Sequence, residues 1–166
     1  GQWNITPVLE EELWIKKEGN QTFQPLFGTY NKYKVFENGL PALYEQLSHK
    51  KGNAAFREKS NLIINNRDVF NNPVEVISNK YNSYCYIWSY NGQYPIAFIK
   101  NINYNHVIQA LGGKSFIDAL AAKSEPTEQD WIKINSLRSN MYFNNSEITT
   151  YVYNTFNGIV SITGPA

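Results

Sequence analysis

Few residues in this sequence have the types and spacing that catalysis or metal binding requires. The two histidines, His49 and His106, lie in different segments, and no His-x-x-x-His or Cys-x-x-Cys pair accompanies them. Cys85 is the only cysteine, so it cannot form an internal disulfide. Consecutive glutamates at 10–12 could form a carboxylate pair for acid–base catalysis, but adjacent residues of a strand point to opposite faces, so a solvated strand edge is the favoured interpretation. The sequence therefore predicts no enzymatic activity, no metal site and no cofactor.

A row of aromatic residues is the sharper candidate for function. This aromatic stripe consists of Tyr84, Tyr86, Trp88 and Tyr90. Alternate residues of a strand share one face, and flat rings in a row can stack on sugar rings or on an apolar protein surface. The competing interpretation is that the stripe is core, buried under helices predicted over 103–140. The sequence favours the core interpretation, because those helices follow directly and need an apolar partner.

The stripe lies in a hairpin that the sequence indicates over residues 81–101. Asn91 and Gly92 stand between two runs of aromatic and β-branched residues, and both tolerate the positive φ angles of a type I′ turn. A two-residue loop fixes the register of the strands. The predicted pairs are Ser89–Tyr94, Trp88–Pro95, Ile87–Ile96, Tyr86–Ala97 and Cys85–Phe98. Neither face of this ribbon is polar, so both faces need cover, and Cys85 is predicted to be a small buried residue.

Composition favours one exported, β-rich domain. The chain has 166 residues, which is enough for one core and too few for two comfortable ones. A net charge of +1 argues against nucleic acid or an acidic membrane surface as a partner. Charged residues are few (17%) and aromatic residues frequent (15%), which is typical of secreted or cell-surface β proteins. No run of about 18 apolar residues predicts a membrane span. Residues 1–7 lack the features of a signal peptide, so we expect export to depend on a segment removed upstream.

Short strands and tight turns are predicted from residue 3 to residue 101. An Asn-Gly pair at 38–39 indicates another hairpin, and Asn-Asn-Pro at 71–73 indicates a further turn. The segment 54–65 is ambiguous between helix and strand, and the adjacent β-branched residues Ile63 and Ile64 favour a strand. These signals together predict an antiparallel β-meander.

The hydrophobic period changes after residue 101. Asn103 can cap a short helix that ends at the glycine pair 112–113. Ser-x-x-Asp at 115–118 and Thr-x-x-Asp at 127–130 match the signature of a capping box at the start of a helix. A helical insert of two or three helices is therefore predicted over 102–140, with its apolar sides available to cover one face of the sheet.

Three segments share a layout of an aromatic or β-branched strand, a short polar corner and a second strand. They are YKVFENGLPALY (33–44), RDVFNNPVEVIS (67–78) and TYVYNTFNGIVSITGPA (150–166). The last segment closely resembles the tyrosine-aspartate (YD) repeat of RHS proteins. The matching residues are Tyr151, Tyr153, Gly158, Ile159 and Pro165. Asn154 stands where the family usually has Asp, and Gly164 stands where a second Asp is common.

The resemblance covers most of the chain from about Pro7 and looks like a region shared by large RHS-repeat proteins of Bacteroidetes type. It is carried by NNPVEVIS (71–78), IWSYNGQYPIAFIKNINYNHV (87–107), DALAAKSEPTEQDWIKINSLR (118–138) and the last hairpin. In that family such repeats wind a long β-sheet into a hollow shell. The aspartyl self-cleavage motif of the family is absent, so the resemblance implies no catalytic residue here.

The sequence thus predicts a single domain over 1–166 of α+β class, dominated by β-structure. Its parts are a β-meander of about seven to nine strands at 3–101, the helical insert packed on one face, and a closing YD-like hairpin at 147–166. The expected function is a structural or interaction unit of a secreted or cell-surface RHS/YD-repeat protein. The alternative is a carbohydrate- or protein-binding module that uses the aromatic stripe. Exposed strand edges predict pairing with further repeat segments, a surface partner or a second copy.

Overall fold

One antiparallel sheet of nine strands makes up most of the described chain. The computed structural model describes residues 10–16, 19, 22–36, 39, 41–50, 60–78, 82–154 and 158–165. Each strand pairs with the next one in sequence, so the spatial order is the chain order. The strands are β1 (Glu10–Ile15), β2 (Gln24–Val35), β3 (Pro41–Lys50), β4 (Ser60–Arg67), β5 (Pro73–Ser78), β6 (Asn82–Ser89), β7 (Tyr94–Lys100), β8 (Glu147–Asn154) and β9 (Gly158–Thr163). The predicted β-dominated meander is confirmed.

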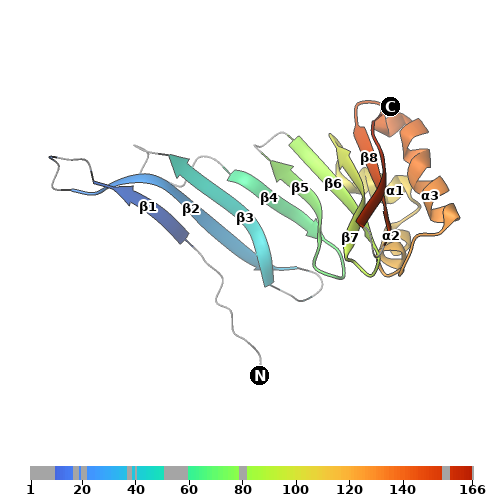
Figure 1. The fold of residues 1–166 in the computed structure, drawn as a ribbon, viewed down its shortest axis with the longest axis horizontal. Helices are drawn as coiled ribbons and strands as arrows, with labels where there is room; N and C mark the ends of the chain where they lie inside the picture. Colours follow the sequence, from blue (N-terminus) through green and yellow to red (C-terminus); the bar gives the residue numbers. More distant parts are fainter. Residues whose placement is uncertain are drawn as a thin grey trace, which may run out of the picture.

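All helices of the described chain come between β7 and β8. They are α1 (Tyr104–Ala110), α2 (Lys114–Ala121), α3 (Glu128–Asn135) and two 3₁₀ turns, η1 (Ser136–Ser139) and η2 (Met141–Phe143). They gather over one face of the sheet, at the end formed by the later strands (Figure 1). The predicted helical insert is therefore confirmed. None of the described helices has the length and apolar character needed to cross a membrane.

Two of the three predicted helix starts are confirmed. The side chain of Asn103 accepts a hydrogen bond from the backbone N–H of His106 at 3.0 Å, so Asn103 is the N-cap of α1. Thr127 and Asp130 form a complete capping box at the start of α3, in which each side chain bonds the other residue's backbone N–H.

The third predicted start, at Ser115, is wrong. Helix α2 begins one residue earlier, and its N-cap is Gly113, which offers no side-chain cap. The φ angles of Gly112 and Gly113 are +79° and +116°, in the region that glycine tolerates best. The connection between α1 and α2 therefore runs through two glycines. Because α2 starts directly after Gly113, Ser115 already lies inside the helix and cannot be its N-cap.

The three segments with a shared layout are all hairpins. Residues 33–44 connect β2 to β3, residues 67–78 connect β4 to β5, and residues 150–166 contain β8 and β9. Gly39 and Gly158 have φ angles of +76° and +78°, which fits the predicted Asn-Gly turns. The asparagines of these two turns lie outside the described residues.

The central hairpin, β6–β7, has the predicted turn. Asn91 and Gly92 have φ angles of +56° and +73°, as a type I′ turn requires, and the N–H of Gln93 donates to the carbonyl of Tyr90 at 3.2 Å. Gly92 is also required sterically, because a Cβ atom at this position would lie 2.5 Å from the ring of Phe70.

The register of this hairpin agrees with the prediction only next to the turn. The confirmed pairs are Ser89–Tyr94 and Trp88–Pro95. A β-bulge between Ile87 and Trp88 then shifts the register by one residue. The pairs beyond it are Ile87–Ala97, Tyr86–Phe98, Cys85–Ile99 and Tyr84–Lys100. The bulge lets the neighbours Ile96 and Ala97 both be fully buried, and it moves Phe98 to the face of the stripe.

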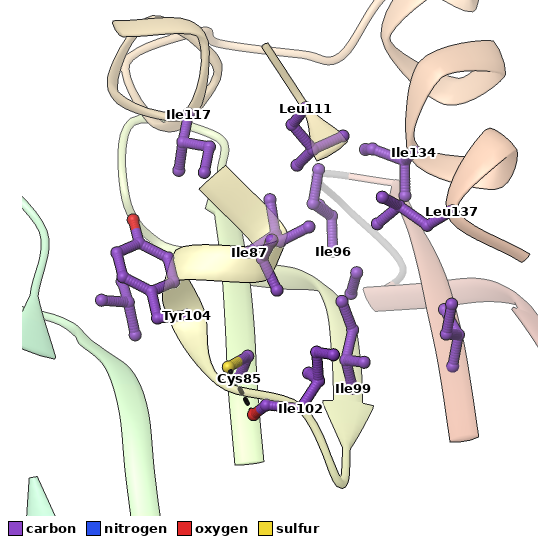
Figure 2. Packing of buried hydrophobic residues seen from close by; sticks show 14 of the residues in the cluster. Cys85, Ile87, Ile96, Ile99, Ile102, Tyr104, Leu111, Ile117, Ile134 and Leu137 are labelled. Atoms are coloured by element: carbon purple, nitrogen blue, oxygen red, sulfur yellow. Dashed lines mark hydrogen bonds between the residues drawn. The ribbon is translucent and has the colours of Figure 1, made fainter. Parts of the chain in front are cut away.

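The core lies between the later strands and the helices, as Figure 2 shows. Its fully buried members include Cys85, Ile87, Ile96 and Ile99 from the hairpin and Leu111, Ile117, Leu120, Ile134 and Leu137 from the helical layer. The hydroxyl of Ser89 donates to the carbonyl of Leu120 at 2.8 Å and ties β6 to α2. Cys85 has no exposed surface, which confirms its predicted buried position, and burial raises the pKa of its thiol.

Candidate functional site

Three residues of the aromatic stripe lie on the sheet face opposite the helices. Tyr84, Tyr86 and Trp88 are half-buried there, and the ring centroids of Tyr86 and Trp88 are 6.3 Å apart. Their neighbours Cys85 and Ile87 point into the core under the helices (Figure 2). For Tyr84 and Tyr86, the favoured interpretation of burial in the core under helices 103–140 is wrong, whereas Trp88 is partly buried and packs against the core cluster. The helices cover the face of small and β-branched side chains, which allow a closer approach than rings do.

Tyr90 departs from the stripe. It has a φ angle of +55°, follows the end of β6, and has only 4% of its surface exposed. Its hydroxyl donates to the carbonyl of Tyr153 at 3.2 Å, and its ring meets the rings of Tyr94 and Tyr153 edge to face, both at 5.8 Å. Burial raises its pKa. Tyr90 therefore belongs to the core, as the core interpretation expected for this residue.

An open groove of about 360 Å³ lies beside the stripe, on the same face, across β6, β7, β8 and β9. Its lining residues are Tyr86, Pro95, Phe98, Tyr151, Tyr153 and Ile159. We call this the aromatic groove. It shares only Tyr86 with the predicted binding residues, and none of its lining side chains is charged at neutral pH. The candidate site therefore lies further toward the end of the sheet than the sequence suggested.

The rings of the aromatic groove are held by contacts with their neighbours. Tyr86 and Phe98, a cross-strand pair, have centroids 5.1 Å apart with planes at 39°. Behind the groove wall, Tyr94 stacks on Tyr153 at 4.7 Å and 19°. The hydroxyl of Tyr153 donates to the carbonyl of Pro95 at 2.9 Å. Stacking on Tyr94 thus fixes the face of the Tyr153 ring, and the hydrogen bond to Pro95 fixes its hydroxyl.

The polar atoms of the groove are neutral hydroxyls. Burial raises the pKa of Tyr86 and of Tyr153, and neighbouring tyrosines raise both further, so these phenols stay protonated at neutral pH. Within the described residues, the hydroxyls of Tyr86 and Tyr151 have no hydrogen-bond partner in the protein. They are available to donate to and accept from a bound molecule.

Sequence reasoning missed most of this groove for two physical reasons. Phe98 was assigned to the wrong face because the bulge in the hairpin is not visible in the sequence. Tyr151 and Tyr153 enter the sequence analysis only as part of the repeat pattern. Their own alternation, Tyr-x-Tyr, is the same signal that identified the stripe. The Tyr-x-Tyr pattern does not show that β8, which follows the helical insert in the sequence, pairs with β7.

Among the described side chains, the residues considered for catalysis do not come together. His106 lies in the first turn of α1, and its ring stacks on that of Tyr142, with centroids 5.5 Å apart. The side chain of His49 lies outside the described residues. Glu12 accepts a hydrogen bond from the indole of Trp14 at 2.8 Å. No group of three His, Cys, Asp or Glu side chains in the described part of the chain is placed to hold a metal ion.

Comparisons of the chain with protein-family models, with curated proteins and with solved structures found no match. The functional argument therefore rests on the geometry of the sheet itself. Two features of that geometry stand out: the aromatic groove and the outer edge of β9, which is the last strand of the sheet.

Proposed function

We propose that this chain is a non-catalytic structural and interaction unit of a secreted or cell-surface repeat protein of RHS/YD type, a segment of a β-shell. The observation that carries the proposal is the state of β9. All six residues of β9 are exposed, including Ile159, Val160 and Ile162, and among the described residues β9 pairs only with β8. An exposed apolar edge strand is a template for another strand.

The two edges of the sheet differ in charge, and the difference favours pairing at β9. The outer strand β1 carries glutamates at 10, 11 and 12, and five of its six residues are exposed. Charged side chains on an edge strand oppose pairing with another chain. Strand β9, Gly-Ile-Val-Ser-Ile-Thr, has no charged residue. We therefore infer that the sheet extends in one direction, from β9.

Arg138 of η1 fixes the end of β9 by hydrogen bonds. Its guanidinium group donates to the carbonyls of Ile148 and Gly164, each at 2.8 Å. It also donates to the carbonyl of Thr163 at 3.2 Å and to the hydroxyl of Thr150 at 3.3 Å. These bonds connect the helical layer to β8 and to the end of β9. An edge strand held in place loses less conformational entropy when another strand adds to it.

The substitution Val160→Lys tests the proposal, because it places a charge on the proposed pairing edge. We expect the native chain to self-associate with rising concentration in multi-angle light scattering. Val160→Lys should weaken this association about tenfold or more. The matched control is Val69→Lys, since Val69 is similarly exposed (52% against 60%) but lies in the turn between β4 and β5.

Two outcomes would contradict pairing at β9. A native chain that remains a strict monomer at millimolar concentration would show that this edge does not recruit a second copy. Equal association of the native chain and Val160→Lys would show that the contact lies elsewhere on the molecule.

A second candidate function, binding of carbohydrate or protein by the aromatic face, is favoured by the aromatic groove. Of the residues predicted for it, Tyr84 and Trp88 flank the groove, Tyr86 lines it and Tyr90 is buried. The indole N–H of Trp88 already donates to the carbonyl of Pro73 at 2.9 Å. Substitution of Trp88 would therefore change folding as well as the surface, and Tyr151 in the groove is the better position for a test.

A further inference from the structure

The aromatic groove has the volume of a small-molecule site. Its volume of about 360 Å³ lies within the range of roughly 300–1,000 Å³ that is usual for small-molecule sites. The groove is open to solvent and not enclosed, so a chain-like ligand can extend beyond it. The four rings in its lining come from β6, β7 and β8, three neighbouring strands of the covered end of the sheet.

The charges around the groove favour an uncharged ligand. None of its six lining residues is acidic or basic. On the same face, Lys100 and Glu147 form an ion pair at 2.6 Å and so neutralise each other. A ligand with a formal charge would lose hydration on entering this groove and would gain no ionic partner from the lining.

Hydrogen-bonding capacity separates the two uncharged ligand classes that stack on aromatic rings. A proline-rich peptide presents mainly carbonyl acceptors, so it can use the phenols of Tyr86 and Tyr151 only as donors and leaves their acceptor capacity unused. The indole of Trp88 is not available, because it donates to the carbonyl of Pro73. Sugar hydroxyls both donate and accept, which matches the unpartnered phenols of Tyr86 and Tyr151.

We propose that the aromatic groove binds a neutral saccharide chain, with Tyr86, Phe98 and Tyr151 as its contact surface. The apolar C–H face of a sugar ring stacks on the aromatic rings, and its hydroxyls bond the two free phenols. Because the rings of Tyr86 and Phe98 already pack against each other, with centroids 5.1 Å apart, little motion of these rings is lost on binding. This proposal rests on the second candidate function above and is independent of pairing at β9.

Isothermal titration calorimetry with defined oligosaccharides tests this proposal. The probes are cellohexaose, maltohexaose and N-acetylchitohexaose, which are neutral, a charged hexagalacturonate, and a proline decapeptide. We expect the native chain to bind at least one neutral hexasaccharide more tightly than either of the other two probes. Tyr151→Ala should weaken that binding about tenfold, which corresponds to loss of one stacked ring. Tyr151→Phe should weaken it by less, because the ring remains and only the hydroxyl is removed.

The matched control is Tyr142→Ala, since Tyr142 is an exposed tyrosine on η2, outside the groove. It should bind the hexasaccharide like the native chain. Thermal unfolding of each variant shows that the fold is retained. The monomeric variant Val160→Lys should also bind normally, which separates a failure of this proposal from a failure of edge pairing.

Several results would overturn the saccharide site. These are no binding of any neutral hexasaccharide at millimolar concentration, tighter binding of hexagalacturonate or of the proline decapeptide, and binding that survives Tyr151→Ala. An equal loss in Tyr142→Ala would place the sugar on another surface. A loss in Val160→Lys would mean that the bound sugar needs an assembled edge, which contradicts a site complete in one chain.

Discussion

The two ends of the sheet are stabilised in different ways. At one end, β5–β8 lie under the helices, and we call this part the covered sheet. At the other end, no described helix lies over β1–β3, which we call the bare sheet (Figure 1). The covered sheet holds side chains with no exposed surface, such as Ile87 and Ile99. In the bare sheet, Trp14, Phe27 and Val35 each have 45% or more of their surface exposed.

This difference shows that strand pairing alone buries little apolar surface: in the described part of the bare sheet, Ala42 and Leu47 are buried at 9% and 7% exposure, and neither belongs to the core cluster under the helices. In the bare sheet, cross-strand contacts of the described residues include the Asn31–Gln46 hydrogen bond at 3.0 Å and the contact of the Lys34 ammonium with the Tyr44 ring, 4.2 Å from its centroid. Cross-strand pairs of this kind contribute roughly 0.2–1 kcal/mol each. Complete burial of one isoleucine side chain contributes about 1.5–3 kcal/mol. The free energy of unfolding is therefore concentrated in the covered sheet, and the bare sheet depends on it.

Buried polar contacts at β4 and β5 connect the bare sheet to the helical layer. Glu75 is 7% exposed and accepts hydrogen bonds from the side chain of Asn66 at 2.9 Å and from the N–H of Tyr104 at 3.0 Å. It thus connects β4, β5 and α1. Arg67 extends the connection to β3, because its guanidinium donates to the carbonyl of Leu43 at 3.0 Å. These bonds join the helical layer to the edge of the bare sheet.

The largest expected effect is that of Ile87→Ala, which removes a fully buried side chain between the sheet and the helices. We expect the free energy of unfolding to fall by about 2–5 kcal/mol, because the change leaves a cavity in the core. Urea denaturation followed by circular dichroism measures it. The matched change in the bare sheet is Val35→Ala, which should stay within about 0.5 kcal/mol, since Val35 is 66% exposed. Similar losses in both variants would refute the distinction between the two ends.

Local features of the fold were predictable from the sequence because their causes are local. Asn-Gly pairs need positive φ angles wherever they occur, so hairpin turns were placed correctly at Asn91 and Gly92. The Thr127 capping box is likewise complete within four residues. The change of hydrophobic period after residue 101 correctly predicted helices between the central and closing hairpins.

The candidate site was not predictable, because it depends on which face the helices cover. Sequence alternation sorts Tyr86 and Ile87 onto opposite faces but does not say which face is buried. The bulge beside Ile87 adds one residue to β7 and moves Phe98 across the sheet. The return of β8 then brings Tyr151 next to the hairpin from more than fifty positions along the chain. Each of these steps is set by tertiary packing.

A smaller effect is expected at Asp130, in the layer that covers the sheet. Burial raises the pKa of this carboxyl, but hydrogen bonds from Lys123 at 2.6 Å and from Thr127 at 2.7 Å outweigh it, and the pKa lies below its ordinary value of 3.8. A lowered pKa stabilises the folded chain above pH 3.8, and this contribution is lost as the pH falls through the lower, folded value. Asp130→Asn should cost about 1–2 kcal/mol at pH 7 and remove this part of the acid dependence.

Asp68, beside the β4–β5 turn, serves as a control because its pKa is shifted in the opposite direction to that of Asp130. Burial raises its pKa above 3.8 despite hydrogen bonds from Asn72 and Phe70. Its contribution to stability therefore decreases as the pH rises from 3.8 through the higher, folded pKa. Urea denaturation at a series of pH values distinguishes the two contributions to the free energy of unfolding, because that of Asp130 is lost as the pH falls and that of Asp68 is lost as the pH rises. An unchanged acid slope in Asp130→Asn would show that the helical layer does not depend on this carboxylate.

The smallest expected effect lies in the bare sheet, at the ion pair of Lys32 and Glu45. The two groups are 2.8 Å apart, with side chains 45% and 15% exposed. A double-mutant cycle of Lys32→Ala and Glu45→Ala should give a coupling energy of less than about 0.5 kcal/mol, because water and salt screen an exposed pair. The coupling should fall further in 0.5 M salt. A salt-insensitive coupling above about 1 kcal/mol would mean that this face is shielded from water, so a second molecule would have to cover the bare sheet in solution.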